Sequence, residues 1–173
     1  CALHGPILKE NLEHYIGQYK TWSSYGVETE GVMIAYTSVY GNTKKAAETL
    51  ASALEAKGCP KVVLCDLARE DMAEAVEDAF RHGKLVLATT TYNGDIFPFM
   101  RTFIEALTER GYQNRTIGII ENGSWAITAG KVIRGLFEKS KDLTWVDTTV
   151  SIMSSMSEEN EAQIEAMAEE LCK

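Results

Sequence analysis

Short apolar runs alternate strictly with amphipathic helical segments from residue 32 to the end of the chain, and this alternation limits the fold more than any other feature. Five apolar runs have strand length, and each is followed by a segment with helical spacing of its apolar residues. The expected strands are residues 32–37, 61–67, 85–90, 116–121 and 145–152, and the expected helices are 42–57, 69–82, 98–110, 129–139 and 158–172. Five such units predict an α/β fold: a doubly wound, five-stranded parallel sheet with helices on both faces and right-handed crossovers.

The first thirty residues do not follow this pattern. Their apolar residues recur at three- and four-residue spacing, and Pro6 suits the first turn of a helix. These residues are Leu8, Leu12, Tyr15, Ile16 and Tyr19. Small and polar residues over 21–31 predict a linker. We therefore expect two parts, an N-terminal helix with its linker over residues 1–30 and an α/β domain over residues 31–173.

Composition and charge exclude several classes of partner. The 173 residues carry a net charge of −8, whereas binding nucleic acid requires a clustered basic surface. The apolar runs are far shorter than the roughly 20 residues that span a bilayer. The four cysteines form no C-x-x-C pair, so a thioredoxin-type site is excluded and reduced thiols in a cytoplasmic protein are favoured. We expect no nucleic acid and no membrane partner.

Three loops at strand ends have unusual compositions, and ligands of open parallel sheets bind at the carboxyl ends of the strands. The first loop is Ser38-Val39-Tyr40-Gly41-Asn42-Thr43. It leads into a helix, whose first backbone N–H groups suit a phosphate, and its hydroxyl and amide side chains add neutral donors. In the alternative reading, Asn42 or Thr43 only caps the helix.

The other two loops combine aromatic side chains with tight turns. The second includes Thr91, Tyr92, Asn93, Gly94 and Phe97. Aromatic faces beside a turn rich in backbone donors suit a flat heteroaromatic ring, although Tyr92 and Phe97 could instead fold into the core. The third includes Asn122, Gly123, Ser124 and Trp125. Trp125 is expected to pack on a neighbouring helix or on a bound ring.

Other phosphate-binding and phosphorylated folds do not fit these residues. The chain has neither G-x-x-x-x-G-K-[ST] nor G-x-G-x-x-G, so a nucleotide triphosphatase and a dinucleotide-binding domain are excluded. A receiver domain needs clustered carboxylates after the first strand and an aspartate after the third, where this chain has Thr37–Ser38 and residues 89–91.

Together the three loops resemble those of the flavodoxin family, and more closely the flavodoxin-like domain of the A-type flavoproteins, or flavodiiron proteins. The resemblance covers essentially the whole chain. It implies a flavodoxin-like fold that binds FMN, with the phosphate in the loop Ser38–Thr43 and the isoalloxazine ring between the loops that contain residues 91–97 and 122–125.

The N-terminal segment adds a second resemblance. Ala2-Leu3-His4-Gly5-Pro6, with Tyr19-x-x-Trp22 after it, is similar to the end of the metallo-β-lactamase-like domain that precedes the flavodoxin domain in flavodiiron proteins. The resemblance implies that His4 is a diiron ligand in a full-length protein. The H-x-E-x-D-H ligand motif is missing from this sequence, so we expect no metal site within the chain itself.

The function implied is that of an FMN-binding electron-transfer domain, which passes electrons to a diiron centre that reduces oxygen or nitric oxide. Its partners would be a redox donor protein or reductase, and the diiron domain of the same polypeptide, within one subunit or across a homodimer. Because flavin supplies the redox chemistry, no catalytic side chain is expected. The alternatives are a free-standing quinone or NADPH reductase and a docking domain without flavin.

Overall fold

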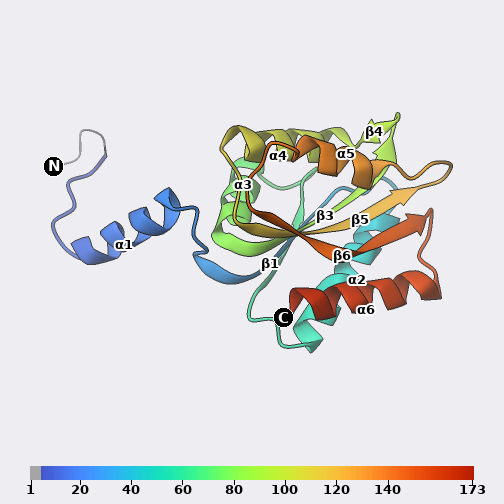
Figure 1. Cartoon of the computed structure of the whole chain (residues 1–173), viewed down its shortest axis with the longest axis horizontal. Coiled ribbons are helices and arrows are strands. Elements are labelled where there is room, and N and C mark those ends of the chain that lie inside the picture. The colour runs from blue at the N-terminus through green and yellow to red at the C-terminus, as the bar shows by residue number, and fades with distance from the viewer. Residues whose placement is uncertain (1–4) are drawn as a thin grey trace.

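The computed structural model describes residues 5–173, and a parallel sheet forms its centre (Figure 1). Five strands run parallel in the order β2-β1-β3-β5-β6. They are β1 (Thr29–Tyr36), β2 (Val62–Asp66), β3 (His82–Tyr92), β5 (Arg115–Gly123) and β6 (Leu143–Met153). The prediction of a doubly wound parallel sheet is confirmed. One strand was not predicted: β4 (Asp95–Ile96) pairs antiparallel with the end of β3.

Five helices cover the two faces of the sheet. They are α2 (Asn42–Ala56), α3 (Met72–Arg81), α4 (Pro98–Glu109), α5 (Ala129–Leu136) and α6 (Glu158–Leu171). In Figure 1, α3, α4 and α5 lie on one face and α2 and α6 on the other. Helix α3 is shorter than predicted because the Asp71 carboxylate caps its start, accepting the N–H groups of Ala73 and Glu74. At its other end, His82 already belongs to β3.

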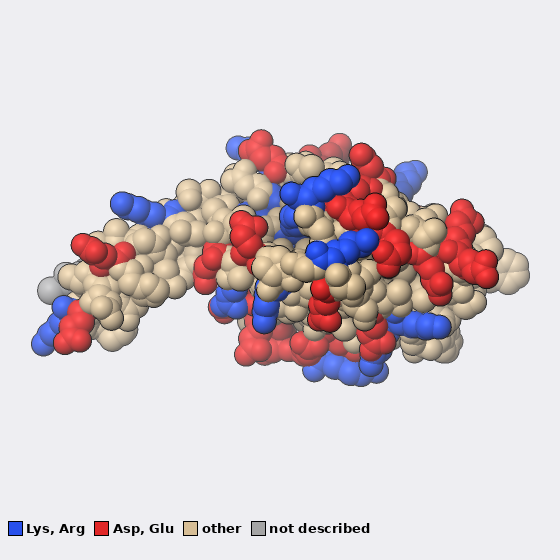
Figure 2. All heavy atoms as spheres, turned by 90° about the horizontal axis from the view of Figure 1, so that it is seen from below, with Lys and Arg blue, Asp and Glu red and all other residues tan. Residues whose placement is uncertain are grey.

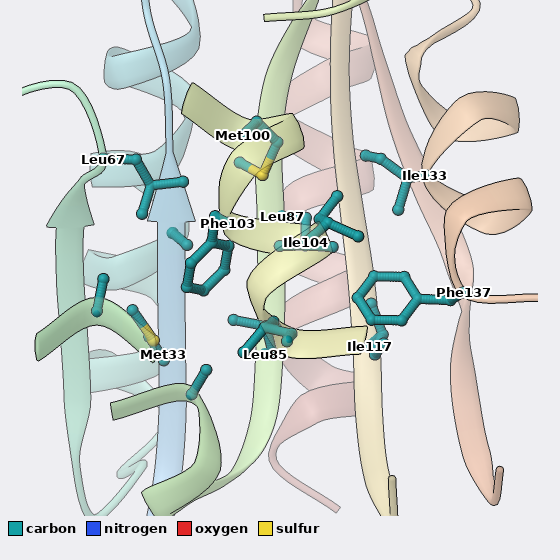
Figure 3. Packing of buried hydrophobic residues seen from close by; sticks show 14 of the residues in the cluster. Met33, Leu67, Leu85, Leu87, Met100, Phe103, Ile104, Ile117, Ile133 and Phe137 are labelled. Atoms are coloured by element: carbon teal, nitrogen blue, oxygen red, sulfur yellow. The ribbon is translucent and has the colours of Figure 1, made fainter. Parts of the chain in front are cut away.

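The core has two layers, one on each face of the sheet. Figure 3 shows the first, in which Phe103 and Ile104 of α4 pack against Leu85 and Leu87 of β3. The second layer joins α2 and α6 to the opposite face through side chains such as Leu50 and Ile164. Because β3 contributes to both layers, it is apolar on both sides, as expected for a central strand of a parallel sheet.

The N-terminal segment departs from the prediction. Helix α1 (Leu12–Ser23) begins six residues after Pro6, and β1 already starts at Thr29. The linker is therefore limited to residues 24–28, and position 30 lies inside β1. Helix α1 has no buried residue. It projects as an arm from the end of the sheet at which the parallel strands begin (Figure 1). The strands point the other way, so their carboxyl ends lie at the end of the molecule opposite α1.

Among residues 5–173, no helix has both the length and the apolarity needed to cross a membrane. On the face drawn in Figure 2, acidic and basic side chains are interspersed.

Candidate functional site

A groove of about 300 Å³ lies at the carboxyl ends of the strands. Twelve residues line it, of which eight carry hydroxyl groups and two carry carboxamides; none is charged. The lining residues are Ser38, Val39, Tyr40, Asn42, Thr43, Thr90, Thr91, Tyr92, Asn122, Gly123, Ser124 and Ser154. The three loops singled out in the sequence therefore converge on one groove. Gly41, Asn93, Gly94, Phe97 and Trp125 belong to the same loops but do not line it.

The first loop leads from β1 into α2 and leaves the start of that helix without a side-chain cap. The N-cap residue is Gly41, at φ +92°, and within the described chain no side chain caps this helix. The reading of Asn42 or Thr43 as a cap is therefore wrong. The Ser38 hydroxyl accepts the Gly41 N–H at 3.1 Å and holds the turn. A Cβ at Gly41 would meet no atom within 4 Å. Glycine is therefore favoured here by the positive φ and not by lack of space.

Thr43 lies at the base of the groove and is only 3% exposed. Its hydroxyl is 3.4 Å from the Asn122 amide nitrogen, a long and therefore weak hydrogen bond. A hydroxyl at the first turn of a helix, beside uncapped backbone N–H groups, is well placed to donate to an anion. The first loop and α2 therefore offer neutral hydrogen-bond donors that suit an anion.

The second loop is a β-hairpin rather than the irregular loop expected. Asn93 and Gly94, both at positive φ, form the two-residue turn between β3 and β4. Tyr92 is half exposed beside the groove, and its ring meets Phe97 edge-on with 5.3 Å between centroids. Phe97 also stacks on Phe99. The hairpin thus presents Tyr92 on an aromatic support instead of folding it into the core.

The hydroxyl of Thr91 already has a structural role. Its oxygen accepts the N–H groups of Thr128 and Ala129, at 3.0 and 3.2 Å, at the start of α5. The hydroxyl proton stays available for an acceptor in the groove. Thr91 therefore joins the second loop to the third.

Trp125 extends from the third loop and is 98% exposed. Of the two alternatives predicted for it, packing on a neighbouring helix is wrong, because nearly the whole indole faces solvent, and packing on a bound ring stays a prediction. Tyr40, in the first loop, is 92% exposed. The exposed faces of these two aromatic side chains are available to a ligand or partner at this end of the sheet.

Two lining residues, Thr90 and Ser154, were missed from the sequence. Ser154 follows β6, and the loop after β6 has no unusual composition. Only the rule that parallel strands end at the same edge could have indicated it. The buried Asn122 amide donates to the Ser154 carbonyl at 3.1 Å, and the Ser154 N–H donates to the Gly123 carbonyl at 3.1 Å. Asn122 thereby connects the loop after β6 with Thr43 of α2.

Two carboxylates next to the groove, Asp95 and Glu121, have hydrogen-bond partners in its walls. Arg101 makes a two-point contact with Asp95 beside the hairpin, with its Nε 3.0 Å from Oδ2. Hydrogen bonding from Arg101 lowers the pKa of Asp95 below its ordinary value. Glu121 accepts the Gly130 N–H and the Ser151 hydroxyl. These charges therefore stabilise the walls, while neutral groups face the groove.

No cluster of three or more metal-binding side chains occurs among residues 5–173. His4, the residue predicted as a diiron ligand in a longer protein, lies outside the described residues.

The fold and the groove define a flavodoxin-type α/β protein, and comparison with known families agrees. The chain matches the family described as Flavodoxin domain over residues 33–140. It belongs to that family.

The relatives identified by sequence and by structure include larger flavodiiron-type proteins. Over 125 residues the chain is 22% identical to the anaerobic nitric oxide reductase flavorubredoxin of Escherichia coli, covering 71% of this chain and 26% of that protein. The chain thus spans about a quarter of the length of this curated relative.

Solved structures with the same fold include rubredoxin oxygen:oxidoreductase of Desulfovibrio gigas, with a TM-score of 0.84 at 19% identity over 93% of this chain and 39% of that one. The flavodiiron protein of Giardia intestinalis gives a TM-score of 0.83 at 17% identity, over 95% and 40% of the two chains. A flavodoxin from the Archaea gives 0.69 at 17% identity, over 83% and 96%. At these identities the likeness establishes the fold.

Proposed function

We propose that this chain is the FMN-binding electron-transfer domain of a flavodiiron-type reductase of oxygen or nitric oxide. The observation that carries the proposal is the groove at the carboxyl ends of the strands, which is lined by neutral hydrogen-bond donors and has aromatic side chains at its margin. Bound FMN would supply one- and two-electron chemistry, while the protein supplies binding, orientation and electrostatics.

The first loop suits the phosphate of FMN. The uncapped start of α2 offers backbone N–H groups to an anion, and the hydroxyls of Ser38 and Thr43 add donors that need no counter-charge. Thr90, Asn122 and Ser154 extend the row of polar groups along the groove, matching the hydroxylated chain that joins the phosphate of FMN to its ring.

The second and third loops suit the isoalloxazine ring. Tyr92 and Trp125 provide exposed aromatic surface at the two loops, and stacking on such surface stabilises a flat ring. Asn93 and Gly94 form the hairpin turn next to Tyr92, and the backbone of this turn can hydrogen-bond to the ring edge. The proposed site is completed by the other residues predicted from the three loops: Val39, Tyr40, Gly41, Asn42, Thr91, Phe97, Gly123 and Ser124.

The position of α1 bears on the electron acceptor. Its apolar side chains line an open groove of about 380 Å³ that includes Leu12, Ile16 and Tyr19, and we propose that a preceding metallo-β-lactamase-like domain covers them. His4 would then be a diiron ligand of that domain. Because α1 and the proposed FMN site lie at opposite ends of the sheet (Figure 1), the diiron domain of a second subunit is the better acceptor. A redox protein or reductase of the cytoplasm would be the donor.

Titration of the apoprotein with FMN tests the proposal. Flavin fluorescence should be quenched with a stoichiometry of one FMN per chain. If the protein binds FAD in preference, or binds no flavin, the proposal fails.

The same preparation separates the two alternative functions. A docking domain without flavin would show no visible absorbance after reconstitution. A free-standing reductase would oxidise NADPH at a steady rate with a quinone as acceptor, whereas an electron-transfer domain would not.

A further inference from the structure

The linker of residues 24–28 forms the joint between α1 and the α/β body, which is residues 29–173. The buried guanidinium of Arg115 lies at this joint, at the end of the sheet opposite the groove. Arg115 is the first residue of β5 and only 2% exposed. Within the described part of the chain, no carboxylate forms an ion pair with it. A buried charge of this kind needs compensation from hydrogen-bond acceptors.

Backbone carbonyls supply that compensation, and two of them belong to the linker. Arg115 Nη1 donates to the Tyr25 carbonyl at 2.7 Å, and Nη2 donates to the Gly26 carbonyl at 2.9 Å. The same two nitrogens bind the carbonyls of Phe80 in α3 and of Asn114. The planar guanidinium, with donors in a fixed fork, thus joins the linker to α3 and to the residue before β5.

Other contacts also hold the joint: the Glu28 N–H donates to the Arg81 carbonyl at 3.0 Å, and the Tyr25 ring lies beside Phe80 with 6.4 Å between centroids. The Tyr25 hydroxyl donates to the Arg110 carbonyl at 3.3 Å. The Glu28 carboxylate accepts the Trp22 indole N–H at 2.7 Å and lies 3.5 Å from Arg81. A cleft of about 760 Å³, lined by Trp22 on one side and Phe80 on the other, separates the end of α1 from the body. Helix α1 itself buries no residue, so its direction depends on the linker.

We propose that Arg115 is a positioning residue that fixes the direction in which α1 leaves the α/β body. By holding the carbonyls of Tyr25 and Gly26, it makes the linker rigid and presents the apolar side chains of α1 in one orientation. Any domain attached before α1 is held in the same way. The inference goes beyond the proposed electron transfer, because the orientation of α1 does not depend on flavin.

The test measures the distance between α1 and the body. Spin labels are attached through a ketone-bearing amino acid at positions 13 and 74, which leaves the native thiols untouched. Glu13 lies in the first turn of α1 and Glu74 in the first turn of α3, and both are exposed. The wild-type protein should give one narrow distance distribution, and Arg115→Met should give a broad one.

Hydrogen exchange then distinguishes a loosened joint from a destabilised fold. In Arg115→Met, the Glu28 amide, which donates to the Arg81 carbonyl across the joint at 3.0 Å, should exchange at least about tenfold faster, the factor expected from losing one hydrogen bond to a charged group. Amides in the centre of β3 should keep their protection. Arg69→Met is the matched control, because Arg69 is exposed and pairs with Asp66 away from the joint.

Two results would overturn the proposal: an unchanged distance distribution in Arg115→Met, or equal acceleration of exchange in the linker and in β3. If Arg115→Met does not fold, Arg115→Lys decides, since lysine keeps the charge but lacks the fork. A narrow distribution in that variant would likewise refute the role of Arg115. Binding of FMN is measured separately and should be the same in all variants, so failure of the proposed function would be recognised independently.

Discussion

Replacing Thr43 by alanine tests whether the start of α2 holds the phosphate of FMN. Thr43 is buried at the base of the groove, and among residues 5–173 its hydroxyl has only the long contact with Asn122. We expect the hydroxyl to donate to the phosphate when FMN binds. Losing a hydrogen bond to a charged group costs about 1.5–3 kcal/mol, which corresponds to a roughly ten- to hundredfold weaker binding of FMN.

The fold should tolerate this substitution. Alanine is the better helix former by up to about 0.7 kcal/mol, and this gain offsets the loss of the weak hydrogen bond to Asn122. The free energy of unfolding should therefore change by less than about 1 kcal/mol. Urea denaturation of the apoprotein measures it and separates an effect on binding from an effect on folding.

The decisive comparison is between FMN and riboflavin, which lacks the phosphate. Fluorescence titration of Thr43→Ala should show weaker binding of FMN and nearly unchanged binding of riboflavin. Thr43→Ser keeps the hydroxyl and should bind FMN almost normally. Thr49→Ala is the matched control on the same helix, because the Thr49 hydroxyl donates to the Lys45 carbonyl. Equal losses for both flavins would show that Thr43 does not hold the phosphate and is a purely structural residue.

Three further outcomes follow from the structure. Gly94→Ala should lower the free energy of unfolding by about 1 kcal/mol, because the φ of +74° at this position is unfavourable for a side chain; thermal denaturation measures it, and an unchanged melting temperature would contradict the strained turn. The pKa of Asp95 is lowered by Arg101, so their ion pair stabilises the fold above the ordinary carboxyl pKa and is lost as the pH falls through the lowered value. The free energy of unfolding of Arg101→Gln should therefore be lower than that of the wild type at pH 7, by less than about 1 kcal/mol for a partly exposed pair. This difference should shrink below about pH 3.8. Urea denaturation at pH 7 and in acid measures it, and a difference that grows in acid would contradict the role of the pair. Burial raises the pKa of the Cys65 thiol to about 12, so a thiol reagent at pH 8 should modify the exposed Cys172 first and reach Cys65 only on unfolding, and mass spectrometry showing early modification of Cys65 would count against its burial.

The fold was predictable because its pattern is carried by apolar residues that the sheet buries. Strands such as residues 85–90 are apolar on both faces, and the expected position matches the buried part of β3. The hairpin strand β4 could not be predicted in this way, since two residues carry no periodicity. Its turn, Asn93-Gly94, was visible in the sequence and is a typical two-residue hairpin connection.

The loops of the candidate site were also visible in the sequence, but the contacts within them were not. Ser154 lies in an ordinary serine-rich turn, and its place in the groove depends on hydrogen bonds to residues about thirty positions earlier. Trp125 was expected to pack on a neighbouring helix or on a bound ring, and no helix covers it in the fold. Long-range contacts of this kind follow from the tertiary structure and leave no local signal.

In the N-terminal segment, the sequence indicated the helix but not where it begins. Its apolar spacing correctly indicated a helix, yet that helix contacts no core, so its start could not be placed from packing. The role of Arg115 was likewise hidden, because an arginine at a strand start is usually exposed.

Amide chemical-shift mapping of the apoprotein during titration with FMN tests most directly whether FMN binds in the groove, since it reports both binding and its location. We expect saturation at one FMN per chain, with the largest shifts in residues 38–43, 90–94, 122–126 and 154, and little change in α1. Saturable shifts centred instead on the cleft beside Trp22 and Phe80, or no shifts at all, would contradict this expectation.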